Sequence, residues 1–422
     1  MKILHIGEND SFGGASRASY RIHRGLLAAG AESRLFVRSK FSDDATVLTC
    51  SGERAQFGAY VAPKIDSFLK RRLHPKCSRD TFSINLFPGM SIPQKLVSEA
   101  DIIHLHWIGQ TTLSYKDIYK FNKPIVWRFP DIFPLTGGCH CSGGCDKYVS
   151  ECGACPFLES SRDYDLSTYN FRKKLKAIQR VDKLVVAAPS RWMVRCASNS
   201  RIFQGRDIRH VPTGVDLEAF SPMDKKQARR LLGLDENCAK KVVAFGAVGA
   251  GSLPRKGFPF LHSAIQALSG ASTEDAGNYK LLVFGSSNDS FGEELGVDIE
   301  YLGRFYDDVS LRLVYAAADV MIVPSTEENL PNNGLEAFAC GTPVVGFNIG
   351  GMPDLIDDKV NGRIACEINA DSLADCIRWV LADDERHKAL CRSAREKAEQ
   401  CFDLKRQVDD YLTIYRDLLG EA

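Results

Sequence analysis

Two glutamates separated by seven residues stand between an expected strand and an expected helix in the C-terminal half of the chain. Glu328 follows the apolar run 320–323 in a polar loop, and Glu336 falls in the first turns of a helix that we expect to begin near Asn332 or Asn333. Carboxylates accept hydrogen bonds from vicinal hydroxyls, and the amides at a helix N-terminus attract phosphate. The segment therefore has groups that could bind a sugar, a diphosphate and a ribose in that order.

The residues at the expected start of this helix decide which amides a diphosphate could use. Pro331 has no amide proton. We therefore expect the phosphate to depend on the three residues that follow, Asn332, Asn333 and Gly334.

A second possible phosphate or hydroxyl site lies near the N-terminus. The expected strand 3–6 leads into Gly13 and Gly14, and a helix follows. Two glycines before a helix expose its first amides to a ligand. The same pair also fits a tight strand-to-helix turn, and its spacing differs from G-x-G-x-x-G, so the sequence does not support NAD binding.

Cysteines gather between residues 139 and 155. Cys139, Cys145, Cys152 and Cys155 stand among glycine-rich turns, and the last two have Cys-x-x-Cys spacing. Four such thiolates suit tetrahedral ligation of a structural zinc, with no open position for catalysis. Free thiols, a disulfide pair or an iron-sulfur cluster are the alternatives, and we expect no catalytic metal.

The elements that must position these residues follow an α/β pattern. Short apolar, β-branched runs alternate with helical patterns, which predicts two Rossmann-like, doubly wound parallel-sheet domains. We place the first domain at 1–207, with a Cys-rich insert at 136–157, and the second at 208–422. The helix expected at 404–419 lies beyond the last strand of the second sheet and is expected to return to the first domain. The expected strands are 3–6, 34–37, 102–106, 125–129, 184–188, 242–245, 281–284, 301–302, 320–323 and 344–347.

Charge and composition exclude some classes of protein. The formal net charge is +1, from 54 basic and 53 acidic residues. A dedicated nucleic-acid binder normally has a large positive charge and a long-range electrostatic field, which this balance does not provide. Fourteen cysteines without an export signal favour the reducing cytoplasm. The basic residues 70–72 follow an apolar stretch. They indicate either an amphipathic helix on the inner face of an anionic membrane or a solvated helix edge.

The segment around the two glutamates resembles the family 4 retaining glycosyltransferases of the GT-B fold. The resemblance rests on Pro-Ser, a glutamate, seven residues, a second glutamate, and then Ala and Gly-Thr-Pro-Val-Val. It implies that Glu328 contacts the donor sugar and that Glu336 holds the ribose of the nucleotide.

The residues upstream are similar to the strand and basic pair that clamp the donor phosphates in that family. They are Phe245-Gly246-Ala247 and Pro254-Arg255-Lys256-Gly257. A cation there has a purpose, because charge builds on the departing diphosphate as the glycosidic bond breaks. The family often has arginine where this chain has Ala247, so we expect Arg255 to supply that charge. Glu328, Lys256 and Arg255 are the catalytic residues that this resemblance implies.

The N-terminal half is similar to a bacterial polysaccharide-building, colanic-acid-like branch of the same family. The similarity lies in residues 101–107 and 123–131, and the four cysteines resemble those of this branch. Pro130 stands where the branch usually has a histidine. We therefore expect Asp131 or His106 to line the site instead.

The resemblance implies a hexosyltransferase that moves a sugar from a UDP- or GDP-sugar to an acceptor hydroxyl with retention. The acceptor would be a growing polysaccharide or a lipid-linked glycan, and no enzyme nucleophile is required. Two alternatives remain open at this point. One is an epimerase or phosphorylase on a related two-domain fold, and the other is a non-catalytic sugar-nucleotide-binding or scaffold protein.

Overall fold

A computed structural model describes most of the 422-residue chain. The described residues are 1–50, 52–75, 77, 80–85, 87, 89–246, 253–270, 278–285 and 298–421. Ala247 lies outside them. The chain divides into two compact units: unit 1 comprises Met1–Pro212 with Lys405–Ala422, and unit 2 comprises Thr213–Leu404.

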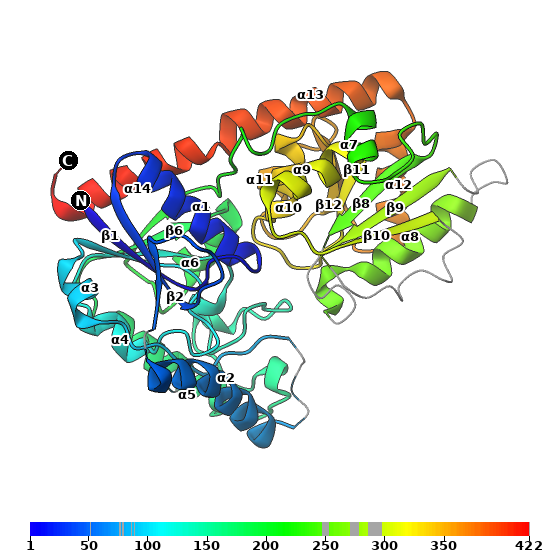
Figure 1. The fold of residues 1–422 in the computed structure, drawn as a ribbon. Helices are drawn as coiled ribbons and strands as arrows, with labels where there is room; N and C mark the ends of the chain where they lie inside the picture. Colours follow the sequence, from blue (N-terminus) through cyan, green and yellow to red (C-terminus); the bar gives the residue numbers. More distant parts are fainter. Residues whose placement is uncertain are drawn as a thin grey trace. The chain divides into compact units, whose positions relative to one another are not determined.

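Unit 1 is built on a seven-stranded sheet with the order β3-β2-β1-β4-β5-β6-β7 (Figure 1). Every neighbouring pair in it is parallel. Its strands are β1 Lys2–Asn9, β2 Glu32–Ser39, β3 Val47–Thr49, β4 Ile102–Leu105, β5 Ile125–Arg128, β6 Leu184–Ala188 and β7 Asp207–His210. Its helices are α1 Gly14–Ala28, α2 Glu53–Leu73, α3 Gln94–Glu99, α4 Tyr115–Lys120, α5 Leu166–Ile178, α6 Arg191–Asn199 and α14 Leu404–Leu419.

Unit 2 has a six-stranded parallel sheet with the order β10-β9-β8-β11-β12-β13. Its strands are β8 Lys241–Gly246, β9 Tyr279–Phe284, β10 Asp298–Gly303, β11 Val320–Val323, β12 Val344–Phe347 and β13 Gly362–Ala365. Its helices are α7 Lys225–Leu231, α8 Phe258–Gly270, α9 Asp308–Ala317, α10 Asn332–Ala339, α11 Met352–Leu355, α12 Ala370–Leu381 and α13 Asp384–Cys401. The prediction of two parallel-sheet, Rossmann-like units is confirmed.

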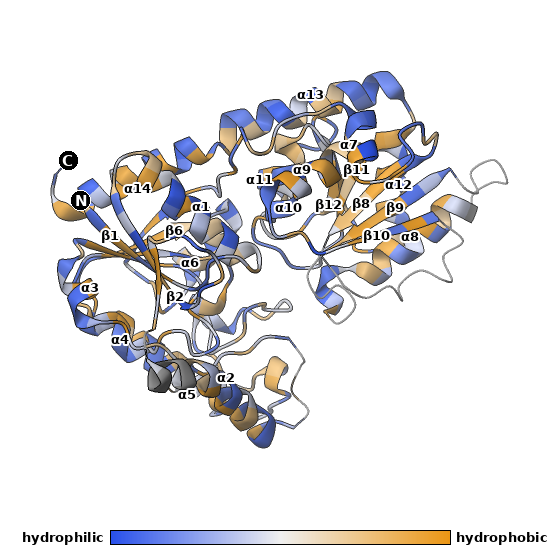
Figure 2. Ribbon diagram, in the orientation of Figure 1, coloured by the Kyte–Doolittle hydropathy of each residue, from blue (hydrophilic) through white to orange (hydrophobic). Residues whose placement is uncertain are grey.

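Burial on both faces of each sheet explains why the central strands read as continuous apolar runs. Every residue of β4, β5, β6, β11 and β12 is buried. Figure 2 shows these strands as hydrophobic, whereas the helices around them alternate in character. Strands covered by helices on both faces favour apolar residues at nearly every position, not only at alternate ones, and His104 and Arg128 are the polar exceptions in these five strands.

The last helix belongs to unit 1, as predicted. Tyr411 and Tyr415 of α14 are fully buried, and the Tyr415 hydroxyl lies 2.6 Å from Nδ1 of His104 on β4. The predicted boundary between residues 207 and 208 falls inside β7 and would assign most of this strand to the second domain. The division follows β7 instead, because β7 pairs with β6 along four residues.

Candidate functional site

The predicted acidic loop lies at the carboxyl end of β11 in unit 2. β11 ends at Val323, and α10 begins at Asn332 with Pro331 at its N-cap. The Glu328 side chain, in the loop between them, keeps 19% of its surface exposed. Glu336 lies within α10 and is only 3% exposed. The carboxyl end of a parallel strand is where open α/β sheets place their ligands.

Lys256 and Glu328 form an ion pair in this loop region. Lys256 Nζ donates to Glu328 Oε2 at 2.8 Å. Lys256 ends the short 3-10 helix Pro254–Lys256, between β8 and α8. Burial alone would raise the pKa of Glu328, but the charges of Lys256 and Arg255 outweigh it and hold that pKa below its ordinary value. Glu328 is therefore a carboxylate beside two cations.

Two glycines hold the backbone around this pair at close approach. Gly257 has a φ of +73°, and a Cβ there would lie 1.7 Å from the Pro324 carbonyl oxygen. Gly350 has a φ of +50°, and a Cβ there would lie 1.8 Å from the Glu328 carbonyl oxygen. Gly351 N–H donates to that same oxygen at 3.2 Å. Neighbouring backbone therefore fixes the position of Glu328.

Replacing Gly350 with alanine is expected to lower the free energy of unfolding by about 2 kcal/mol more than replacing Gly303. Gly303 also has a positive φ, +68°, but a Cβ there would meet no atom within 4 Å. The control therefore carries the same backbone strain without the collision. Urea denaturation of the two variants measures the difference, and equal losses would show that the Glu328 backbone is not held by close packing.

The residues predicted to hold the diphosphate are already engaged with protein groups. Asn333 Nδ2 donates to the Gly246 carbonyl oxygen at 2.9 Å, which ties α10 to the end of β8. Gly334 N–H donates to Asn333 Oδ1 at 2.9 Å and to the Pro331 carbonyl oxygen at 3.1 Å. Asn332 is half-buried at the start of the helix. Their role in phosphate binding stays a prediction.

Glu336 has a partner that the sequence did not indicate. Tyr315 of α9, which is buried, donates its hydroxyl to Glu336 Oε2 at 2.7 Å. Tyr315 also contacts the segment that follows α10, since the Tyr315 carbonyl oxygen accepts a hydrogen bond from Thr342 Oγ1 at 2.7 Å. This contact fixes the Glu336 side chain, and ribose binding by Glu336 stays a prediction.

Gly13 and Gly14 lie at the start of α1 in unit 1, as expected. Both are exposed, and Gly13 is the N-cap with a φ of +81°. A Cβ at Gly13 would meet no atom within 4 Å. The first turn of α1 contains no acidic residue. The geometry has room for an anion or a hydroxyl, and binding there stays a prediction.

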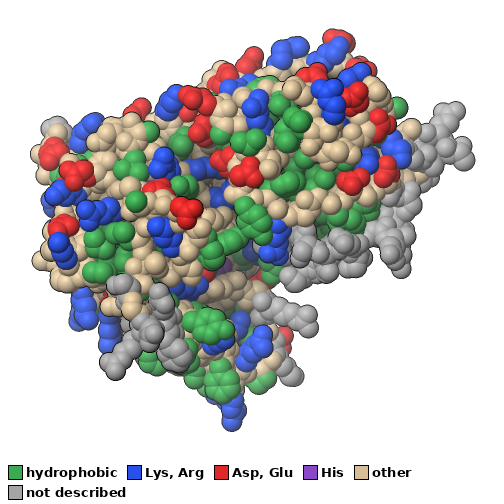
Figure 3. Space-filling model, viewed as in Figure 1, with side chains coloured by type: hydrophobic (Ala, Val, Ile, Leu, Met, Phe, Trp, Pro, Cys, Tyr) green, Lys and Arg blue, Asp and Glu red, His purple; other side chains and the backbone are tan. Residues whose placement is uncertain are grey.

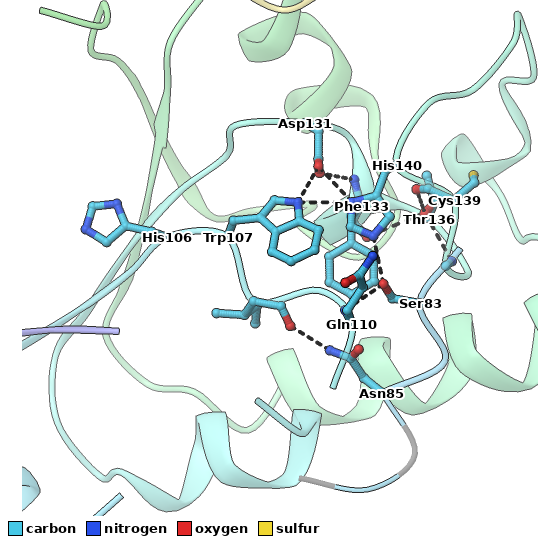
Figure 4. A network of polar contacts seen from close by, with 12 residues as sticks. Ser83, Asn85, His106, Trp107, Gln110, Asp131, Phe133, Thr136, Cys139 and His140 are labelled. Carbon is cyan, nitrogen blue, oxygen red and sulfur yellow. Dashed lines mark hydrogen bonds and ion pairs between the residues drawn. The ribbon is translucent and has the colours of Figure 1, made fainter. Parts of the chain in front are cut away.

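A polar network in unit 1 joins residues that the sequence did not connect (Figure 4). Asp131, which follows β5, accepts from Trp107 Nε1 at 2.7 Å through Oδ2. The same oxygen lies 2.7 Å from His140 Nδ1. On the other side of the ring, His140 Nε2 lies 2.8 Å from Ser83 Oγ. The network brings together the ends of two strands and the Cys-rich insert.

Of the two residues expected near the site of the missing histidine, only Asp131 enters this network. Burial alone would raise the pKa of Asp131, but His140 and the amide of Phe133 keep it lower than usual. His106 is fully buried and lies 2.9 Å from His5 in the core, between its Nε2 and His5 Nδ1. His106 is therefore a core histidine in this structure.

The Cys-rich insert holds its cysteines as thiols. All fourteen cysteines lie in the described residues and are free. Burial raises the pKa of Cys139, and it raises that of Cys152 to about 12. Among the described residues, three potential metal ligands come within 4.8 Å of one another only at His5, His104 and His106. The four predicted cysteines, all within the described part of the chain, lie near enough to raise one another's pKa, but no three of their sulfur atoms come within 4.8 Å of one another.

Zinc in the insert stays a prediction that metal analysis can test. We expect about one equivalent of zinc in the purified full chain if these thiolates bind it, as four-coordinate structural sites do. Replacing Cys152 with serine should remove the zinc, whereas replacing Cys238 of unit 2 should not. A native chain without zinc or iron would refute the prediction.

Comparison with known proteins identifies relatives of part of the chain. Residues 239–383 match the protein family described as Glycosyl transferases group 1. The D-inositol 3-phosphate glycosyltransferase of Saccharomonospora viridis is 35% identical over 227 residues, which are 50% of this chain and 51% of that protein. The protein of the same description from Mycolicibacterium smegmatis is 32% identical over 262 residues, 58% of this chain and 55% of its own length. The matched stretch thus spans about half of these relatives.

Solved structures share the fold over nearly the whole chain. Sucrose-phosphate synthase from Thermosynechococcus elongatus has a TM-score of 0.69 at 20% identity, covering 100% of both chains. Anabaena HepE in complex with UDP-glucose has a TM-score of 0.62 at 18% identity, covering 98% of this chain and all of its own. WaaG, involved in lipopolysaccharide biosynthesis, has a TM-score of 0.64 at 17% identity, covering 98% and 99%. At these identities the likeness shows the fold, which is GT-B, as predicted.

Proposed function

We propose that this chain, whose residues 239–383 match the group 1 glycosyltransferases, transfers a sugar from a nucleotide sugar to an acceptor hydroxyl. The observation that carries the proposal is the Lys256–Glu328 ion pair, held by glycines at the carboxyl end of β11. Glu328 lies in the loop that precedes α10, and Lys256 lies between β8 and α8. The pair offers a carboxylate for sugar hydroxyls and cations for a diphosphate in one place.

In the proposed reaction, Lys256 and Arg255 stabilise the departing diphosphate, and Glu328 accepts hydrogen bonds from the donor sugar. An ammonium group has three N–H donors, so Lys256 can keep its bond to Glu328 and still donate to a phosphate oxygen. Negative charge grows on the leaving group as the glycosidic bond breaks, and fixed cations stabilise that charge most where water is excluded. Glu336, oriented by Tyr315, would accept from the ribose hydroxyls.

We propose retention of configuration and transfer of a hexosyl group, on the strength of the resemblance around Glu328 and Glu336. The acceptor hydroxyl would attack from the face that the diphosphate leaves, without an enzyme nucleophile. Unit 1, which carries Gly13 and Gly14, would bind the acceptor. The acceptor would be a growing polysaccharide or a lipid-linked glycan of the colanic-acid-like kind.

The donor is proposed to be a UDP- or GDP-sugar in the cytoplasm. Anabaena HepE, which shares the fold, has been solved with UDP-glucose and with UDP and glucose. The relatives named above are glycosyltransferases, and this favours transfer over epimerisation, phosphorolysis or binding without catalysis.

A thermal-shift series with nucleoside diphosphates and their sugars tests this proposal. A ligand at one hundred times its Kd should add about 2.7 kcal/mol to the unfolding free energy. We expect a rise in Tm with UDP or GDP and a smaller rise in the Lys256→Met variant. Inorganic phosphate is the control for simple anion binding. No shift with any nucleotide would count against the proposed function.

We also propose that α2 rests on the inner membrane surface. Tyr60, Phe68 and Leu73 of α2 are 65%, 65% and 58% exposed, and Lys70, Arg71 and Arg72 form its last turn. Figure 3 shows hydrophobic and basic side chains side by side in the region of α2. Exposed aromatic residues next to cations favour an anionic bilayer surface. Within the described residues, no helix has the length and apolar character to cross a bilayer.

Reversing the charge of Lys70, Arg71 and Arg72 is expected to weaken vesicle binding by at least about a hundredfold, because the loss of each cation alone costs about 1 kcal/mol. The measurement is co-sedimentation with phosphatidylcholine vesicles that contain phosphatidylglycerol. Lys240→Glu, an exposed change in unit 2, is the control. If the native chain does not bind these vesicles, or binds as the variant does, the cluster is a solvated helix edge.

A further inference from the structure

Trp107 is the second residue after β4, at the carboxyl edge of the unit 1 sheet, and it is half-buried. Its Nε1 donates to Asp131 Oδ2 at 2.7 Å. The centre of its ring lies 5.0 Å from that of His140, which in turn stacks on Phe133 at 4.6 Å and 4°. Figure 4 shows the indole between His106 on one side and the Asp131–His140 pair on the other.

Two groups lie near His140 Nδ1, and the shorter contact sets the tautomer: Trp107 Nε1 lies at 3.2 Å, whereas Asp131 Oδ2 lies at 2.7 Å. Asp131 has a lowered pKa and is an acceptor, so His140 Nδ1 carries the proton that it receives. His140 Nε2 then accepts from the Ser83 hydroxyl at 2.8 Å. Ser83 Oγ in turn accepts from the Gln110 backbone N–H at 2.7 Å. A complete chain of hydrogen bonds therefore runs from the loop after β4 to Asp131.

This serine, histidine and aspartate have the order of a hydrolytic triad, but burial excludes that chemistry. Ser83 is fully buried, and its oxygen already accepts from the Gln110 amide. A nucleophile must reach its substrate, and Ser83 cannot. The three residues instead position what they touch, and the only half-exposed aromatic side chain bonded to them in the described residues is Trp107.

The backbone under the rings leaves the indole little freedom. A Cβ on Gly109 would lie 2.5 Å from His140 Cε1 and 2.8 Å from Trp107 Cζ2, so both rings rest directly on this glycine. Asn85 donates to the carbonyl oxygens of Ile108 and Leu113 at 2.8 and 2.9 Å. The loop between these residues is thereby fixed at both ends.

Strained backbone and polar groups flank the indole. Gln110 and Thr111 have φ values of +48° and +63°, a conformation that persists in non-glycine residues chiefly at functional sites. Arg38 Nη1 donates to the Gln110 carbonyl oxygen at 2.6 Å, and Arg38 also pairs with Glu8 at the end of β1. A fixed aromatic ring thus shares one sheet edge with a carboxylate and a guanidinium.

We propose that Trp107 is a stacking platform for a sugar ring of the acceptor, and that Ser83, His140 and Asp131 are the positioning residues that hold it. The C–H face of a pyranose is apolar and packs on an aromatic face, while its hydroxyls need acceptors and donors such as Glu8 and Arg38. The inference rests on the proposed function, because it names the chemistry of the acceptor that unit 1 binds.

The test is saturation-transfer NMR of the full chain with methyl glycosides of glucose, galactose and mannose as probes. Trp107→Ala should weaken sugar binding roughly tenfold or more, and Trp107→Phe, which keeps a ring, should retain most of it. Trp192→Ala is the matched control for Trp107→Ala, because Trp192 is another half-buried tryptophan of unit 1. His140→Ala should weaken binding, and His140→Asn, whose amide can still donate to Asp131, should restore part of it.

The outcomes separate this inference from the proposed function. UDP- or GDP-induced thermal shifts should be the same in all Trp107 and His140 variants, since they report on the donor. Native sugar binding in Trp107→Ala, or no sugar contact in the native chain, would overturn the platform. A His140→Asn variant no better than His140→Ala would overturn the positioning role. If neither UDP nor GDP raises the Tm of the native chain, the proposed donor site is instead refuted.

Discussion

Replacing Glu328 with glutamine is expected to lower kcat/KM for sugar transfer by about 10² to 10³. The amide keeps the shape of the side chain but loses the charge and half of the acceptor sites. In the native chain the carboxylate is held charged by Lys256 at 2.8 Å. It is therefore ready to accept from the sugar hydroxyls without reorganisation.

Glu327→Gln is the matched control, because Glu327 is the adjacent acid of the same loop. Both variants should still unfold in one cooperative transition, with the midpoint of Glu328→Gln lowered only by the loss of its ion pair, which separates lost chemistry from lost folding. The measurement is release of UDP or GDP from a nucleotide sugar in the presence of acceptor. Near-native turnover by Glu328→Gln, or equal losses in both variants, would refute the assigned site.

Replacing Lys256 with methionine is expected to lower kcat about a hundredfold, because the leaving diphosphate loses its nearest fixed cation. Methionine keeps the length of the aliphatic stem. Lys256→Arg should restore part of the activity, since it returns the charge. Full activity in Lys256→Met would show that the diphosphate departs without this cation.

The Lys256→Met variant is also expected to change how the free energy of unfolding depends on pH. The lowered pKa of Glu328 means that its ion pair stabilises the fold above the ordinary pKa of the carboxyl and loses that effect as the pH falls through the lowered value. The native chain should therefore be more stable than Lys256→Met at neutral pH, and the difference should shrink in acid. Urea denaturation across this range measures it. A difference independent of pH would contradict the assigned pair.

The sequence predicted the sheets because their central strands are buried on both faces and almost entirely apolar, with His104 of β4 and Arg128 of β5 as exceptions. It missed β3 and β13, which are edge strands with half or more of their residues only partly buried, so they lack a continuous apolar run. It placed Glu328 and Glu336 in a loop and the adjoining helix, where the structure has them, since a polar loop between an apolar strand and a helix is a local pattern.

Contacts between distant segments could not be predicted in the same way. Tyr315 reaches Glu336 across 21 positions, and Ser83 reaches His140 across 57. No local spacing in the sequence indicates such pairs. His140 stands between two cysteines, in a segment whose spacing suggests a metal site instead. Asn333 and Gly334 have the residue types expected near a phosphate, but their bonds to Gly246 and Pro331 depend on how α10 packs.

A crystal structure of the full chain with UDP, or with GDP if that nucleotide gives the larger thermal shift, tests the assigned site most directly. We expect the diphosphate oxygens within hydrogen-bonding distance of Lys256 Nζ and the ribose hydroxyls at Glu336. The nucleotide bound elsewhere, with the Lys256–Glu328 pair untouched and Glu336 still bonded only to protein, would contradict the account.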